Sequence, residues 1–178
     1  MIKKSLIFLS FAIFLTAGLA MAGPVSLYES LSRKGIVKVF VADLTDATAA
    51  PKADLPDLKK KIEEGLKNRK SIRFELVSKE DADILLEGSV TEFLWTDSDP
   101  VDMITGWAAA AIDAAKKDHY ARLMVDFVIR DAKGPVLWQD KVRATLTDPA
   151  MTEAESLPRI NDRMVEAFMR QALAKPRR

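Results

Sequence analysis

The sequence predicts an α/β (α+β) fold: a single mixed sheet of about five strands, with helices packed on one face, ending in a β-hairpin and a carboxy-terminal helix. Three observations predict it. The stretch from Ala82 to Trp95 is rich in aliphatic, β-branched and aromatic residues, as expected for a central strand. Two alternating apolar segments flank the turn Asp131–Gly134, which indicates a hairpin. Charged segments with apolar residues at helical spacing lie before and after these strands.

The amino-terminal segment has the pattern of a secretory signal peptide. Lys3 and Lys4 precede an apolar run of about 14 residues, shorter than the roughly 20 that span a membrane, and Ala20-Met21-Ala22 is a small-x-small site. We expect export to the periplasm with cleavage after Ala22; an uncleaved amino-terminal anchor is the alternative. The chain then divides into a signal peptide, a leader, a single α/β domain and a basic tail: 1–22, 23–35, 36–174 and 175–178.

Charge and cysteine content limit the partners of the exported chain. Loss of Lys3 and Lys4 with the signal leaves 25 Lys and Arg against 26 Asp and Glu, a net charge of −1. This balance gives no electrostatic reason to expect a nucleic-acid partner. The chain has no cysteine, hence no disulfide and no lipid-bearing cysteine of a lipoprotein. Membrane association is therefore expected only through a partner, an uncleaved signal or an amphipathic surface.

The first half of the domain reads as strand, helix and strand. Ile36–Val41 is the first strand, and Thr45–Ala53 is expected to be a loop. Asp54 can cap the next helix, and Pro56 fits its first turn. Ser71–Val77 is a short strand. The apolar residues of the helix recur at helical spacing: Leu55, Leu58, Ile62 and Leu66.

The central strand carries an apolar run without alternation. Ile84, Leu85 and Leu86 are consecutive, which suits a strand covered on both faces or heavily packed on its second face. Gly88 within the strand indicates either a β-bulge or a close approach of another group to the backbone. Of these two interpretations we favour the bulge.

A helix is predicted from Asp97 to about Lys117, with Asp99 and Pro100 at its start. The acidic residues there do not have the spacing of an EF-hand calcium loop, and we expect no metal. Small residues four apart would allow close backbone approach, either in ordinary packing or at an interface with a protein or membrane surface. The candidate interface residues are Met103, Gly106, Trp107, Ala110 and Ala114.

The last segments are a hairpin and a helix. The capping-box spacing from Thr152 to Glu155 predicts the start of the final helix. We expect one face of the hairpin to be buried through Leu123, Val125, Phe127, Ile129, Val136, Trp138, Val142 and Leu146. The buried stripe of the helix is expected to comprise Leu157, Ile160, Met164, Val165 and Phe168.

No catalytic motif is found. His119 is the single histidine, which excludes sites that need two imidazoles, and we place it at a helix end beside Asp118. There is no G-x-S-x-G elbow, phosphate loop or G-x-G-x-x-G, so we expect neither an enzyme nor a cofactor. The alternative is a small-ligand carrier or enzyme with a site near Asp102, Asp113, His119 and Tyr120.

The order of elements, together with Ala82–Val90, Phe127–Asp131 and Gly134–Trp138, resembles small α/β modules of bacterial envelope-assembly proteins. These are the lipopolysaccharide-assembly lipoprotein LptE, the periplasmic domain of curli secretion channels and the amino-terminal domain of the Tol–Pal translocation protein. The resemblance covers residues 36–147, and the missing lipoprotein cysteine departs from the first two. It implies a non-catalytic scaffold or adaptor that binds another envelope component.

We therefore expect a periplasmic binding or assembly module that recognises an envelope protein through the small-residue helix or an exposed sheet edge. Self-association through Gly106–Ala114 to form a homo-oligomer is a further alternative.

Overall fold

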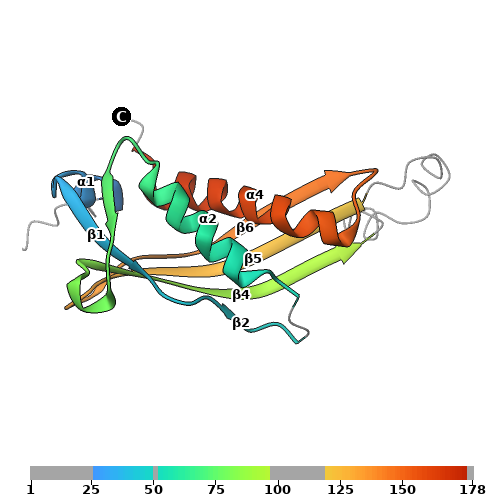
Figure 1. Cartoon of the computed structure of the whole chain (residues 1–178), viewed down its shortest axis with the longest axis horizontal. Coiled ribbons are helices and arrows are strands. Elements are labelled where there is room, and N and C mark those ends of the chain that lie inside the picture. The colour runs from blue at the N-terminus through green and yellow to red at the C-terminus, as the bar shows by residue number, and fades with distance from the viewer. Residues whose placement is uncertain (1–25, 50–51, 97–118, 176–178) are drawn as a thin grey trace, which may run out of the picture.

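The computed structural model describes residues 26–49, 52–96 and 119–175. In these ranges the chain forms one mixed sheet with helices along it (Figure 1). The elements in chain order are α1 (Leu27–Ser32), β1 (Ile36–Val41), β2 (Thr45–Asp46), α2 (Leu55–Lys67), β3 (Arg73–Leu76), a 3₁₀ turn (Lys79–Asp81), β4 (Ile84–Thr96), β5 (His119–Asp131), β6 (Val136–Asp148) and α4 (Glu153–Leu173).

The strands lie in the order β3-β1-β4-β5-β6, and the short β2 also pairs with β4. β4 pairs in parallel with β1 and β2 and antiparallel with β5, so it is the central strand, as predicted. β5 and β6 form the predicted hairpin, thirteen residues long in each arm. The fold class expected from the sequence is confirmed.

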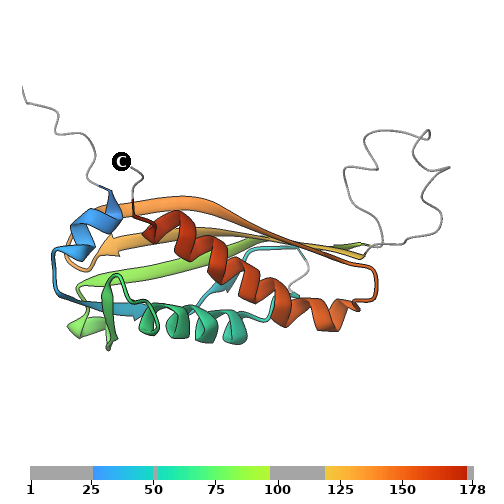
Figure 2. The ribbon, with the colours of Figure 1, turned by 90° about the horizontal axis from the view of Figure 1, so that it is seen from above.

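The helices of the described chain cover one face of this sheet (Figure 2). Asp54 caps α2, accepting a hydrogen bond from the backbone N–H of Asp57 at 3.1 Å, and Pro56 lies in the first turn. α4 starts with the predicted capping box, in which Thr152 and Glu155 satisfy each other's backbone N–H groups. Both helix starts are therefore determined by local sequence.

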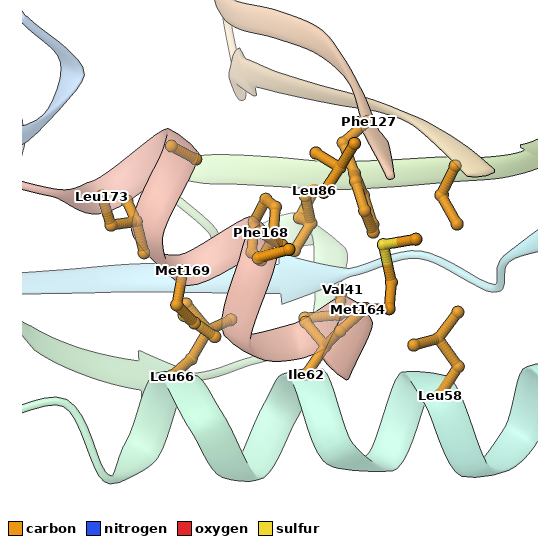
Figure 3. Packing of buried hydrophobic residues seen from close by; sticks show 14 of the residues in the cluster. Val41, Leu58, Ile62, Leu66, Leu86, Phe127, Met164, Phe168, Met169 and Leu173 are labelled. Atoms are coloured by element: carbon orange, nitrogen blue, oxygen red, sulfur yellow. The ribbon is translucent and has the colours of Figure 1, made fainter. Parts of the chain in front are cut away.

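The hydrophobic core fills the space between the helices and the sheet (Figure 3). The rings of Phe127 on β5 and Phe168 on α4 have centroids 4.6 Å apart, and Trp138 meets Phe168 edge-on at 5.9 Å. Phe127 and Phe168 are fully buried and each contribute about 1.5–3 kcal/mol, while Trp138 is half-buried. The labelled core residues come from both helices and three strands: Val41, Leu58, Ile62, Leu66, Leu86, Phe127, Met164, Phe168, Met169 and Leu173.

Helices α2 and α4 are joined by a buried polar contact. Asn161 is 1 % exposed, and its Nδ2 donates to the carbonyl oxygen of Asp54 at 3.1 Å and to Oδ2 of Asp57 at 2.9 Å. Both hydrogens of the amide are satisfied, so the group orients α4 on the start of α2. A Cβ on Gly65 would lie 2.8 Å from Cε of Met169, which shows how close the two helices are.

The structure corrects two sequence-based predictions for the central strand, β4. Ile84 and Leu86 are buried while Leu85 is half-buried on the other face, so burial alternates, and no described helix covers that second face. The favoured bulge at Gly88 is also wrong, because the irregularity lies between Val90 and Glu92. Gly88 instead permits close packing: a Cβ there would lie 2.8 Å from Cδ2 of Leu44 and 3.1 Å from the Phe127 ring.

Three smaller expectations also differ. The predicted loop at Thr45–Ala53 begins with the two-residue strand β2. Val136 is 42 % exposed instead of buried, because a register shift after Ile129 pairs it with Arg130. Leu157 and Val165 are only half-buried, and Asn161 takes part in the buried stripe of α4.

The close packing at Gly88 gives a test of the fold. We expect Gly88→Ala to lower the free energy of unfolding by about 1–3 kcal/mol, because the added methyl group overpacks the site between Leu44 and Phe127. Urea unfolding measures the change, and Ser89→Ala on the opposite face is the matched control. Equal stability of both variants would contradict this packing.

Candidate interaction surface

The sequence-predicted interface lies outside the described residues. This holds for all of its members, Met103, Gly106, Trp107, Ala110 and Ala114, and also for Asp102 and Asp113 of the alternative ligand site. The candidate surface described below is formed by the rest of the chain.

His119 and Tyr120, the other two residues of the alternative site, lie at the start of β5. The expectation that His119 ends a helix is wrong, because it is the first residue of a strand. Its ring stacks on Trp95, with centroids 5.3 Å apart and planes 15° from parallel. Tyr120 is 9 % exposed and pairs with Thr96 of β4.

A hollow of about 430 Å³ lies near this end of the sheet, at the connection from β6 to α4. Asp148 forms an ion pair with Arg159 at 2.8 Å, and its pKa is lowered first by the backbone N–H of Ala150 and then by Arg159. Glu155 is occupied by the capping box. The carboxylates are thus used to hold the connection. The lining residues are Asp148, Ala150, Met151, Glu155, Pro158 and Arg159.

Neither metal chemistry nor a membrane span is indicated by the described ranges. Within residues 26–49, 52–96 and 119–175, no three His, Cys, Asp or Glu side chains are grouped so that they could hold a metal ion. No helix in those ranges is both long and apolar enough to cross a membrane.

The face of the sheet opposite the helices carries a row of three apolar side chains and one arginine. Phe40 on β1 pairs with Leu85 on β4, Leu85 with Arg130 on β5, and Arg130 with Val136 on β6, so one row crosses four strands. Val128, two residues before Arg130, points to the same face. We call Phe40, Leu85, Val128, Arg130 and Val136 the open-face patch. Its apolar members are half-buried, apart from Val136, which is exposed.

Cross-strand ion pairs begin within the patch, at Arg130, and continue along the face. Nε of Arg130 donates to Oε2 of Glu87 at 3.0 Å. Farther along, Arg122 donates to Glu92, and Nζ of Lys141 lies 3.6 Å from Oδ1 of Asp126. These groups are partly exposed, and such pairs contribute little to stability. Aromatic residues and Arg are enriched in protein–protein interfaces, and the patch contains Phe40 and Arg130.

Strand β6 forms one edge of the described sheet. With thirteen residues it is about 44 Å long, since a strand rises roughly 3.4 Å per residue. At the opposite edge, β3 has only four residues. Along β6 the side chains that point to the open face are Gln139, Lys141, Arg143, Thr145 and Thr147.

Sequence reasoning missed the open-face patch. The alternation of β5 indicated a second face, but Val136 was assigned to the core because no sequence signal marked the register shift near it. The unalternated Leu85 was the available signal, since an apolar residue next to two core residues must point away from them on a strand.

Comparison with models of known protein families and with curated protein sequences found no match. Solved structures are similar. The hypothetical protein CT253 of Chlamydia trachomatis is 10% identical, with a TM-score of 0.51, and the match covers 78% of this chain and 98% of that one.

Two further structures have lower scores. The PelC dodecamer of Paraburkholderia phytofirmans is 18% identical, with a TM-score of 0.47 and coverage of 78% and 90%. A minor lipoprotein of Acinetobacter baumannii is 16% identical, with a TM-score of 0.44 and coverage of 75% and 90%. At these identities the likeness concerns the fold alone. Bacterial lipoproteins are thus among the similar structures, while assignment to the LptE, curli or Tol families stays a prediction.

The capping box at the start of α4 makes the stability of the protein depend on pH. The backbone N–H of Thr152, followed by its hydroxyl, holds the pKa of Glu155 below its ordinary value of 4.5. Because the pKa of Glu155 is lowered in the folded state, the ionised carboxylate stabilises the fold fully above pH 4.5. This stabilisation is lost as pH falls through the folded-state pKa.

We therefore expect the stability difference between the wild type and Glu155→Gln to be constant near neutral pH and to shrink in acid. Thermal unfolding at about pH 6 and about pH 2.5 measures it. A difference that is the same at both values would show that the Glu155 charge does not stabilise the cap.

Proposed function

We propose that the protein is an exported, non-catalytic module of the bacterial cell envelope that binds another envelope protein through the open face of its sheet. Export rests on the signal-like residues 1–22. The observation that carries the binding proposal is the open-face patch, in which four apolar side chains and Arg130 lie together on four strands, on the face that no described helix covers.

The composition of this face supports a binding role. An antiparallel sheet with one solvated face normally alternates apolar residues toward the core and polar residues toward water. Phe40, Leu85 and Val128 depart from that pattern together, in neighbouring rows of one face. Contiguous apolar surface with a polar border is typical of protein interaction sites, whereas single exposed apolar residues are common everywhere.

The shape of the face favours a protein over a small molecule. Small ligands are usually enclosed in concave sites lined by apolar side chains. The hollow at the β6–α4 connection lies elsewhere, and its carboxylates already have partners. The open-face patch is a strand surface, and its ion pairs can exchange partners with a second protein at small free-energy cost.

Capture of the partner from native envelope tests the proposal. We expect the tagged wild type to recover a stoichiometric envelope protein after mild cross-linking. Val136→Asp and Phe40→Ser should reduce that recovery severalfold, because each removes apolar contact area from the patch. Val136 is exposed, so Val136→Asp should change the free energy of unfolding by less than about 1 kcal/mol, and Phe40→Ser, at a half-buried position, is compared only after its folding has been checked.

The matched control is Ala154→Asp, which adds the same charge as Val136→Asp at an exposed position on α4. Recovery should be unchanged with this variant. Equal recovery by the wild type and both patch variants, with all of them folded, would overturn the open face as the binding surface.

A further inference from the structure

The outer edge of β6 borders the open face, and its backbone groups can form hydrogen bonds with another chain. In the described chain, no strand lies beyond β6. An unpaired edge presents a row of N–H and C=O groups, and an added strand can pair with them. Short edge strands resist such pairing; β3 has this protection and β6 does not.

On the open face, the side chains of β6 are positively charged or neutral. On the open face of β6, Lys141 and Arg143 are two residues apart, and their neighbours Gln139, Thr145 and Thr147 carry no charge. Lys141 is half-exposed and reaches Asp126 only at 3.6 Å. Arg143 is exposed, and no carboxylate of the described residues forms an ion pair with it. An incoming strand would therefore meet the positive charges of Lys141 and Arg143 on the open face, whereas the exposed Asp140 lies on the helix side of β6.

A second copy of this chain is a poor occupant. Two β6 strands related by a two-fold axis pair antiparallel, with the axis at one residue. An axis at Lys141 or Arg143 places that residue opposite itself, and an axis at Val142 places Lys141 opposite Arg143. An axis at Asp140 opposes two aspartates. Like charges directly opposite each other destabilise a strand pair, so the four symmetric registers with the axis at residues 140–143 are disfavoured.

We propose that β6 accepts an extended strand of the partner protein that carries carboxylates at alternate positions, facing Lys141 and Arg143. This deepens the proposed function and rests on it, because it names the chemistry of the partner at the rim of the same face. Main-chain hydrogen bonds supply the affinity, and the alternate carboxylates supply the selectivity. Opposite charges across neighbouring strands stabilise the pair and orient the incoming strand.

Synthetic strands test the proposal on the full exported chain. The probe is a peptide of about ten residues that alternates Thr and Glu, compared with peptides in which Gln or Lys replaces Glu. We expect the Glu peptide to bind most tightly and to protect backbone amides of β6 from hydrogen exchange. Methylation of alternate peptide nitrogens should abolish binding, because it removes the donors along one edge of the peptide.

Charge reversal on the protein is the second test of the proposal. The double variant Lys141→Glu, Arg143→Glu should bind the Glu peptide about tenfold more weakly, since two favourable cross-strand pairs become repulsive. The control, Lys60→Glu with Lys70→Glu, makes the same change of net charge at exposed positions away from β6 and should bind normally. Equal binding of the three peptides, absence of binding by the Glu peptide, or protection confined to other strands would overturn the proposal.

Envelope capture separates this proposal from the proposed function. If the Lys141, Arg143 double variant recovers the partner as well as the wild type while Val136→Asp does not, the acidic strand is overturned and the open-face function stands. If neither variant changes recovery, both proposals fail.

Discussion

The structure depends on the burial of one face of its three long strands, β4, β5 and β6. In β4, β5 and β6 alternate side chains point to one face, and α2 and α4 pack only there. Phe168 of α4 lies between Phe127 and Trp138 and joins the helix to the hairpin. Because every second strand residue must point away from this core, the position of the helices determines which side chains remain for contact with other molecules.

That constraint explains why the open face combines two kinds of residues. Its ion pairs, such as Arg130 with Glu87, keep long side chains ordered across neighbouring strands at little gain in stability. Between them lie Leu85 and Val128, which bury no surface in the core. A face of this composition is compatible with water in the isolated chain and gains stability when apolar area is covered by a partner.

Much of this fold could be predicted from local sequence, for physical reasons that differ by element. The capping residues Asp54 and Thr152 act within one helical turn, so both helix starts were predictable. Gly88 was different, since its neighbours Leu44 and Phe127 come from other strands and loops and only the three-dimensional packing identifies them. The exposure of Val136 likewise follows from a register shift that no residue type in the sequence indicates. The open-face patch was therefore not predicted, and an exposed sheet edge was predicted without the strand that forms it.

The central claim is that the open face is accessible in the isolated protein and covered in the envelope. The chain has no cysteine, so single thiols can report on it: Val136→Cys on the open face, Ala154→Cys on α4 and Val142→Cys in the core. In the purified protein, maleimide should label the first two at similar rates and the third very slowly. In intact envelope, the Val136→Cys thiol alone should become protected relative to the Ala154→Cys thiol. Equal labelling of these two thiols in both settings would contradict the claim.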